Sequence, residues 1–375
     1  MAKANSSSIS ARVALKLRDG GPDSVNGIAE ALELSRTSVE NVLGVLTASA
    51  DITRTTVAGS GVGRPSRRYE LDAPAGYVAG VDVGKASIRV VIADLAGTVI
   101  ADHAGGGVGT VADGASKLDT VTLQVKAAFH EASLPLDRLR AVGLSLPGIV
   151  DEAGSVVTSV VIPEWSGVDV GSRLAVALGA PVVVDNGVRL AAVAEHELGA
   201  AQLVDDVLYL SVGNRIAMGL ILDGKPRRGR HNAAGDIGRL AVRGVDPETG
   251  EIRWAHGTGA AELFQRVRDD EPAAIQELAA FTEELAHSLA TLIMAVDPGK
   301  VVVGGGLSRA HDEFLVPLGR AVSRRIRLAA EVPIVGARLG DEAAAHGALV
   351  HAFAHASERI YGIAGMTVPR ITPIA

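Results

Sequence analysis

Apolar residues recur at helical spacing three times near the start of the chain. In the first run, over residues 9–17, apolar side chains lie four positions apart. Two further runs, over 25–32 and 39–46, place them at i, i+3, i+4 and i+7, which is the stripe of an amphipathic helix. The pattern predicts three short helices. The small polar residues 1–8 that precede them predict a disordered tail.

The turn between the second and third predicted helices is tight. Only Glu33 and Leu34 separate the second stripe from Ser35, which is expected to cap the third helix as Ser24 caps the second. A turn this short forces the two helices to cross steeply, as in a helix-turn-helix. A plain three-helix bundle would show the same stripes, so that alternative stays open at this point.

Two β-like stretches follow, at residues 52–57 and 67–71, with a glycine-rich turn over 58–63 between them. They predict a hairpin, and therefore a wing after the three helices. Residues 9–71 are thus expected to form a winged helix-turn-helix domain. The segment Asp-Ala-Pro-Ala-Gly at 72–76 has the composition of a linker.

From residue 77 onward, strand-like and helical patterns alternate. The strand-like runs lie at 77–83, 87–93, 99–101, 141–146, 182–184, 207–212, 216–222 and 301–303, and the helical ones at 120–131, 188–198, 285–296 and 342–352. Such alternation predicts an α/β body over residues 77–375, with a central sheet in each half.

Composition limits the possible classes of protein. The chain has 375 residues, of which 47% are hydrophobic, enough for two or three domains with real cores. It has no cysteine, so disulfides and thiolate zinc sites are excluded. The sequence shows neither a long uncharged apolar run nor a signal-peptide pattern. We therefore expect a cytoplasmic protein with no membrane partner.

The distribution of charge differs between the two regions. The net charge of −7 by itself argues weakly against binding nucleic acid. Residues 1–72, however, hold nine Lys and Arg against eight Asp and Glu, whereas the rest of the chain has an excess of eight acidic residues. A near-neutral module on an acidic body can bind DNA if its basic side chains share one face.

The third helix is predicted to be the recognition helix in the major groove. Its buried stripe leaves a polar set outward near its N-terminus: Arg36, Thr37, Ser38, Glu40 and Asn41. Arg36 could contact guanine and Asn41 adenine, although either could touch phosphate or only solvent. Ser24 and Ser35 could cap their helices and also bring backbone N–H groups to phosphate.

The wing and linker add four basic residues, Arg54, Arg64, Arg67 and Arg68. Arg64 lies between Gly63 and Pro65, which hold the chain extended. An arginine placed in this way suits a narrow A·T-rich minor groove. The alternative is a flexible linker with solvated charges. A single winged helix buries little surface, so a specific site needs a dimer on a two-fold DNA palindrome.

Three segments of the body carry a family resemblance: 142–151 (VGLSLPGIVD), 297–308 (DPGKVVVGGGLS) and 339–352 (LGDEAAAHGALVHA), with Gly-Arg-Pro at 63–65 before them. In this order and spacing the chain resembles the ROK family. That family joins sugar kinases and transcriptional repressors on an actin-like ATPase fold (the sugar kinase/Hsp70 superfamily) with two lobes and a cleft between them. The resemblance implies operator DNA and a homodimer or tetramer.

The phosphate-binding loops depart from the family patterns. The kinases of the family have Asp-Ile-Gly-Gly-Thr-Lys where residues 82–87 read Asp-Val-Gly-Lys-Ala-Ser, and Gly-Thr-Gly-Ile-Gly where 213–217 read Gly-Asn-Arg-Ile-Ala. Lys85 adds bulk where phosphate oxygens should approach backbone N–H groups, and Arg215 replaces a second glycine. ATP binding is therefore not expected.

The catalytic base of the family has no counterpart here. The family pattern is Glu-Asn-Asp-Ala-Asn, with a helix glutamate eight residues after the catalytic aspartate. Glu195 fits that glutamate, which puts Gly187 at the position of the base. Asp185 lies two residues earlier and remains an alternative base. The resemblance therefore implies a kinase-like domain without catalytic residues.

The sugar- and zinc-binding motifs are altered as well. The family's Glu-x-Gly-His appears as Asp-Ile-Gly-Arg at 236–239, and the Cys-x-Cys-Gly-x-x-Gly-Cys zinc motif has no cysteine to supply it. We therefore expect no zinc, no other metal and no cofactor. The remaining residues near the family's sugar site are the expected effector contacts: Asn186, Glu195, Asp236 and Arg239. The expected effector is a sugar or a sugar derivative.

Arg239 allows two interpretations of this site, one with an anionic ligand and one with an internal ion pair. A guanidinium in place of histidine favours an anionic ligand such as a sugar phosphate or sugar acid. The simpler alternative is an internal ion pair with Asp236, three residues away.

Taken together, these patterns favour a repressor of carbohydrate metabolism that a sugar controls. The alternatives are an active ATP-dependent sugar kinase with a fused DNA-binding domain, a regulator that needs no effector, and a scaffold or regulator that responds to a protein partner.

Overall fold

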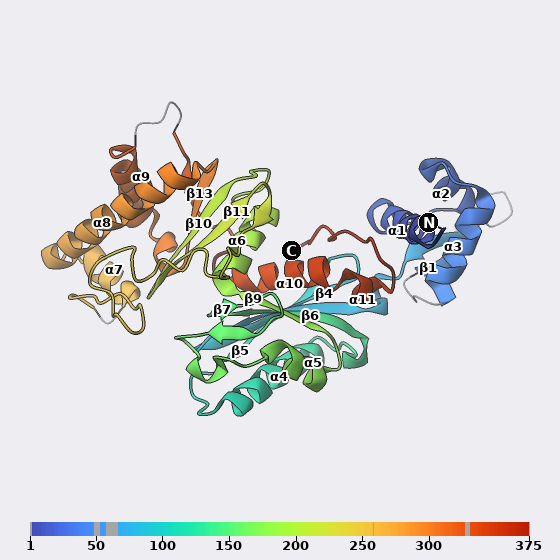
Figure 1. Cartoon of the computed structure of the whole chain (residues 1–375), viewed down its shortest axis with the longest axis horizontal. Helices are drawn as coiled ribbons and strands as arrows, with labels where there is room; N and C mark the ends of the chain where they lie inside the picture. Colours follow the sequence, from blue (N-terminus) through green and yellow to red (C-terminus); the bar gives the residue numbers. More distant parts are fainter. Residues whose placement is uncertain (1, 49–52, 58–66, 258, 327–330, 375) are drawn as a thin grey trace. The chain divides into compact units, whose positions relative to one another are not determined.

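The computed structural model describes residues 2–48, 53–57, 67–257, 259–326 and 331–374. The chain divides into two compact units. Unit 1 comprises Met1–Leu144, Asp169–Val184 and Ala348–Ala375, and unit 2 comprises Ser145–Val168 and Asp185–Gly347. Each unit has its own sheet and its own core (Figure 1).

Unit 1 begins with a winged helix-turn-helix. Its elements are α1 (Ala2–Gly20), α2 (Val25–Leu32), α3 (Arg36–Ala48), β1 (Thr53–Val57) and β2 (Arg67–Leu71). The two strands pair antiparallel, and an isolated bridge between Asp23 and Tyr69 adds a third strand-like segment. The predicted stripes face inward, with Val13, Leu17, Ile28, Val39, Leu43 and Leu46 buried. Since the wing and the tight turn are present, the plain three-helix bundle is not the fold.

Helix α1 starts earlier than expected. It runs from Ala2, so the polar segment predicted to be a disordered tail is helical in the structure. Alanine and lysine in this segment are strong helix formers, and they extend a helix that packing already stabilises further along. The turn of the wing and Arg64 lie outside the described residues.

The body of unit 1 is a five-stranded sheet in the order β5-β4-β3-β6-β9. Its strands are β3 (Tyr77–Val83), β4 (Ser87–Asp94), β5 (Val99–Gly106), β6 (Leu139–Leu146) and β9 (Val182–Asn186). Its helices are α4 (Gly114–Glu131), α5 (Val170–Leu178), α11 (Ser357–Tyr361) and the later part of α10 (Ala343–His355). Figure 1 shows α4 and α5 on one face of the sheet and α10 on the other.

Burial along the strands reflects these layers. Strand β3 is almost wholly buried and the middle of β4 is buried because helices cover both faces of the sheet, whereas β5 alternates between buried or half-buried and exposed positions, as an edge strand does. Helix α10 passes so close to β6 that a Cβ on Gly143 would collide with the carbonyl oxygen of Ala348. Only glycine fits this contact.

Unit 2 has a five-stranded sheet in the order β12-β11-β10-β13-β14. Its strands are β10 (Val207–Val212), β11 (Ile216–Leu222), β12 (Lys225–Pro226), β13 (Lys300–Gly304) and β14 (Ile334–Gly336), with a separate hairpin of β7 (Ile149–Val150) and β8 (Val156–Thr158). Its helices are α6 (Gly187–Glu197), α7 (Ala260–Arg268), α8 (Pro272–Val296) and α9 (Val316–Ser323).

The period of two in β10 divides the core of unit 2 into two layers. Leu208 and Leu210 pack with α7, α8 and α9 on one face, whereas Val207 and Tyr209 pack with α6 on the other. Figure 1 shows α8 and α9 together on one side of the sheet and α6 on the opposite side.

The predicted strands and longer helices are present in the structure, and most of them differ from the prediction only in the residues at which they begin or end. Strands β3, β10 and β11 have the predicted bounds, while α4 starts earlier because Asp113 caps it, accepting from the N–H groups of Ala115 and Ser116. Helices α5, α7 and α9 were not anticipated, because their short apolar runs give little periodic signal. Within the described ranges no helix is long and apolar enough to span a bilayer.

Candidate functional site

The predicted recognition helix is capped as its sequence suggested. The hydroxyl of Ser35 accepts a hydrogen bond from the backbone N–H of Ser38 at 3.1 Å, and the two serine hydroxyls lie 2.8 Å apart. Ser24 caps α2 in the same way, accepting from the N–H of Gly27 at 3.1 Å. Both serines thus serve as caps, and their contact with phosphate stays a prediction.

The outward face of α3 is open. Arg36, Thr37 and Asn41 are exposed, while Ser38 is half-buried and turned toward the cap. The Arg36 side chain, 67% exposed, forms an ion pair with Glu40 at 2.9 Å. Exposed pairs of this kind are worth less than about 1 kcal/mol, so DNA could take the arginine at little cost.

The described arginines of the wing differ in whether their charge is free to contact DNA phosphate. Arg54 on β1 lies 2.5 Å from Glu70 and 3.5 Å from Asp72, and its hydrogen bond to Glu70 raises its pKa. Its charge is therefore already paired. Arg67 and Arg68, at the start of β2, are exposed and remain candidates for phosphate contact.

The first phosphate-loop counterpart lies between β3 and β4 in unit 1. Lys85 is exposed, so its side chain does not fill the turn as its size suggested. The backbone of residues 107–109 occupies the turn instead: the N–H of Gly107 donates to the carbonyl of Ala86, and that of Gly109 to Lys85. These bonds use acceptors of the turn and pack a second chain segment against it.

The second loop counterpart, between β10 and β11 in unit 2, is hydrogen-bonded to residues 249–252. Arg215 donates from Nε to the carbonyl of Thr249 at 2.8 Å and from Nη2 to the Glu251 carboxylate at 2.6 Å. The N–H of Ile252 donates to the carbonyl of Asn214 at 2.8 Å. The residue that replaces a glycine of the loop therefore anchors a neighbouring segment.

Asp246 holds that neighbouring segment, residues 245–253, through backbone hydrogen bonds and one ion pair. Asp246 accepts from the N–H groups of Glu248 and Thr249 at 2.9 and 2.8 Å and pairs with Arg253 at 2.5 Å. The bond from the Thr249 N–H is the largest cause of the lowered pKa of Asp246. A Zn²⁺ of the family type does not fit here, because no thiolate is present and the carboxylate is already used.

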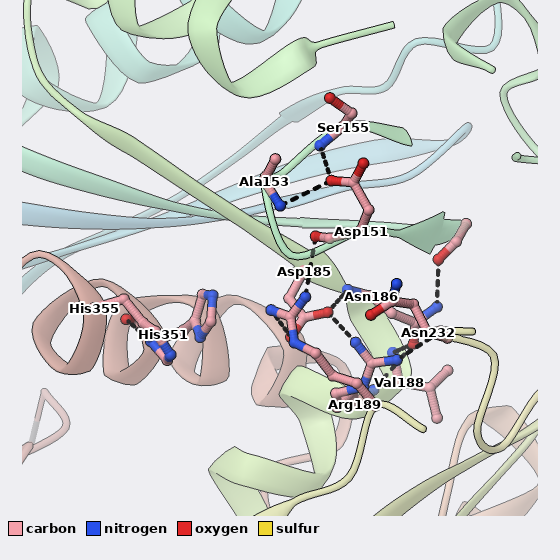
Figure 2. Close-up of polar contacts among 12 residues, drawn as sticks. Asp151, Ala153, Ser155, Asp185, Asn186, Val188, Arg189, Asn232, His351 and His355 are labelled. Atoms are coloured by element: carbon pink, nitrogen blue, oxygen red, sulfur yellow. Dashed lines mark hydrogen bonds and ion pairs between the residues drawn. The ribbon is translucent and has the colours of Figure 1, made fainter. Parts of the chain in front are cut away.

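Asp185 and Asn186 end strand β9, and Gly187 starts α6. Asp185 is 2% exposed. Its carboxylate pairs with Arg189 on one oxygen and with Arg228 at 2.8 Å on the other, and it also accepts from the N–H of Asn186 at 2.7 Å. Figure 2 shows Asp185, Asn186 and Arg189 joined by these bonds. Two guanidiniums and one backbone N–H thus occupy three of the roughly four lone-pair sites of this carboxylate, which leaves it poorly placed to take a proton from a substrate hydroxyl.

The side chain of Asn186 bonds to the backbone at the start of α6. Its side-chain oxygen accepts from the N–H groups of Val188 and Arg189 at 3.0 and 3.1 Å, and its amide donates to the carbonyl of Gly148 at 2.8 Å. It is therefore the N-cap of α6, and a ligand would meet only what this cap leaves open.

Glu195, predicted to contact an effector, has a different role. It is 0% exposed, and its two oxygens accept the N–H groups of Ala200 and Leu339, each at 2.7 Å. It therefore joins the end of α6 to a segment far along the chain. The sequence could not show this, because the acceptors and donors are 144 residues apart in one case.

Arg239 does not pair with Asp236 in the described part of the chain. Its guanidinium donates to the carbonyl of Glu248 at 2.7 Å, and it lines an open pocket of about 980 Å³ with Arg243, Glu284, His287 and Arg325. Asp236 is exposed. Among the described residues, no group of three His, Asp or Glu side chains is arranged to hold a metal ion.

Sequence reasoning missed the two arginines that surround Asp185. Arg189 occupies the last position of the family's Glu-Asn-Asp-Ala-Asn pattern, so an arginine in place of asparagine was a visible signal. Arg228 gave no such signal, because its ion pair with Asp185 joins residues brought together only by folding.

Comparison with known proteins gives regulators and kinases. The ROK family model matches residues 78–252 and 240–355. The chain is 22% identical over 334 residues to the xylose repressor of Caldicellulosiruptor bescii, covering 80% of this chain and 83% of that protein. It is 25% identical over 317 residues to a glucokinase of Streptomyces coelicolor, covering 73% and 96%.

Solved structures give the same two groups. A ROK family transcriptional regulator described as a homologue of the E. coli MLC protein superposes with a TM-score of 0.70 at 21% identity, covering 95% of this chain and 97% of that one. The ROK hexokinase of Thermus thermophilus gives 0.63 at 27% identity, covering 75% and 99%. With a family model that matches most of its length, a winged helix-turn-helix and an actin-like α/β body, this chain belongs to the ROK family.

Proposed function

We propose that this protein is a DNA-binding transcriptional regulator whose kinase-like body does not transfer phosphate. The observation that carries the proposal is the state of the catalytic position: Gly187 has no side chain to act as base, and the nearby Asp185 is locked between Arg189 and Arg228. The open face of α3 supports the DNA-binding part. The likeness to the xylose repressor supports a role in carbohydrate metabolism.

The body would then act as a sensor. A sugar or sugar derivative bound in it would favour one arrangement of a homodimer over another, with a coupling of about 1–3 kcal/mol. The dimer would read two half-sites about one or two helical turns apart, because a single winged helix buries too little surface for specificity. Binding of neither ATP nor zinc is part of this proposal.

Selection of genomic DNA fragments by the purified full-length protein tests the DNA-binding part. We expect palindromic sites whose affinity falls steeply with salt, since phosphate contacts release counterions. Arg36→Ala should weaken binding at one base position, while Arg173→Ala, an exposed arginine on α5, is the matched control and should have no effect. Recovery of no preferred sequence would contradict the proposal.

A coupled assay with ATP and hexoses tests the alternative of an active kinase. The kinase relatives make this alternative specific: the chain covers 96% of the Streptomyces coelicolor glucokinase. We expect no turnover above the level of a sample without protein. Turnover that is abolished by Asp185→Ala and retained by Asp223→Ala, with thermal melting showing both variants folded at the assay temperature, would show that the aspartate acts as base.

A further inference from the structure

One buried and one half-buried guanidinium share a single carboxylate at the start of α6. Arg189 is 3% exposed and the Arg228 side chain is 25% exposed, while Asp185 between them is 2% exposed. Burying a charge is unfavourable unless an opposite charge compensates it. Here two positive charges meet one negative charge, so the cluster carries an uncompensated positive charge inside unit 2.

The cluster also has spare hydrogen-bond donors. A guanidinium carries five N–H donors. Arg189 donates to the Asp185 carboxylate and to the carbonyl of Asn232 at 3.0 Å. Arg228 pairs with the Asp185 carboxylate and donates to the carbonyl of Asp151 at 3.1 Å. The Nε of Arg189 is buried and has no hydrogen-bond partner among the described residues. A buried donor without an acceptor is rare in folded proteins.

Arg228 reaches the backbone carbonyl of Asp151, but in the described part of the chain the Asp151 carboxylate forms no ion pair with either arginine. The carboxylate of Asp151 accepts from the N–H groups of Ala153 and Ser155, both at 2.9 Å, and Figure 2 shows it turned toward them. Burial lowers the pKa of Arg189, and the neighbouring charge of Arg228 lowers it further despite the attraction of Asp185. Both effects indicate a place where an added anion would be favourable.

The segment that supplies Arg228 is itself basic. Residues 225–231 include Lys225, Arg227, Arg228 and Arg230 and no acidic residue. Arg227 pairs with Asp223 at 2.9 Å at the surface. Arg228 is the member of this segment whose side chain reaches the buried carboxylate, with its exposed fraction left toward solvent.

The substitutions relative to the family pattern change the charge in the same direction. The pattern Glu-Asn-Asp-Ala-Asn has two carboxylates, whereas residues 185–189 have one carboxylate and one guanidinium. The missing acid at Gly187 also leaves the N-terminus of α6 without a negative side chain on its first residue. The positive end of the helix dipole therefore adds to the two arginines.

We infer that Arg228 and Arg189 form a subsite for the acidic group of the effector, so that the ligand is a sugar carrying a carboxylate or a phosphate. This inference rests on the proposed function, because it names the ligand class of the sensor. The acidic group accepts from the spare N–H donors of Arg228 and offsets the positive charge that Asp185 leaves. Asp185 keeps the two guanidiniums in place, and Arg239 has no part in this subsite.

The test measures binding to the full-length protein by titration calorimetry at constant ionic strength. The probes are D-gluconate, D-glucose 6-phosphate, D-glucose and inorganic phosphate. We expect an acidic sugar to bind at least about tenfold more tightly than D-glucose, as one charge-assisted contact provides. Preference for gluconate identifies a sugar carboxylate and preference for glucose 6-phosphate a sugar phosphate, whereas binding of inorganic phosphate without either acidic sugar contradicts the inference.

Variants on the basic segment separate the subsite from general charge. Arg228→Gln should lower the affinity for the acidic sugar by about tenfold or more. Arg228→Lys should lower that affinity less, because lysine keeps the positive charge. Arg227→Gln, one residue away and paired at the surface, is the matched control and should stay within about twofold of the wild type. Thermal melting of each variant confirms that it is folded.

The inference is overturned if D-glucose binds as tightly as both acids, if neither acidic sugar binds, or if Arg228→Gln binds the acid as the wild type does. DNA binding by the same preparations distinguishes this failure from failure of the proposed function. Retained binding to selected DNA with no preference for acids rejects only the ligand class. Loss of sequence-specific DNA binding in the wild type rejects the regulator itself.

Discussion

The buried carboxylate of Asp185 allows a prediction that separates a structural anchor from a catalytic base. Asp185→Asn removes the charge that holds Arg189, 3% exposed, and Arg228, whose side chain is 25% exposed. Removing one partner of a buried ion pair costs about 3–5 kcal/mol. Because Arg228 can regain water and the amide keeps one oxygen, we expect the lower limit, about 3 kcal/mol.

Urea unfolding followed by tryptophan fluorescence measures this loss directly. Both tryptophans, Trp165 and Trp254, lie in unit 2, so the signal reports on the unit that holds the cluster. With a slope of about 2 kcal/mol per molar urea, a loss of 3 kcal/mol moves the midpoint down by about 1.5 M.

A surface pair in the same unit provides the control. Asp223→Asn breaks the pair with Arg227, whose side chains are 83% and 48% exposed, and should cost less than about 1 kcal/mol. If Asp185→Asn shifts the midpoint no more than Asp223→Asn does, the cluster does not stabilise unit 2. The reasoning that Asp185 is held as an anchor would then be refuted.

Three further predictions concern other parts of the chain. Glu195→Ala leaves the half-buried backbone N–H groups of Ala200 and Leu339 without this acceptor and should lower the free energy of unfolding by about 3 kcal/mol in the same urea assay; a loss under 1 kcal/mol would contradict its structural role. Burial of His103 opposes its protonation, but hydrogen bonds to Gln124 and Glu131 outweigh burial and raise its pKa, so its contribution is full below about pH 6.5 and is lost as pH rises through the higher folded value. Thermal melting between pH 5.5 and 8.5 should show this loss in the wild type and a smaller one in Glu131→Gln; equal profiles would exclude the histidine. Ser35→Ala removes the cap of α3 and should cost about 1 kcal/mol together with a loss of DNA affinity, and unchanged DNA affinity would show that the start of this helix does not meet DNA.

Much of the candidate DNA interface could be predicted from sequence, and less of the sensor. The caps at Ser24 and Ser35 and the exposed face of α3 follow from residues within one or two turns of each other. The roles of Asn186 and Glu195 could not be assigned in this way. Both match family positions near a sugar site. In the structure, however, Asn186 caps a helix, and the buried carboxylate of Glu195 accepts two backbone N–H groups.

The sequence by itself determined the elements and the losses: the helical stripes, the strands of period two, the absent cysteines and the glycine at position 187. These are local properties, set by spacing and by residue type. Only the tertiary structure decided the partners: Asp185 with Arg228, Arg215 with Glu251, and Arg239 with the carbonyl of Glu248. Which charge meets which depends on segments that folding brings together, because burial makes an unpaired charge costly wherever the chain happens to place it.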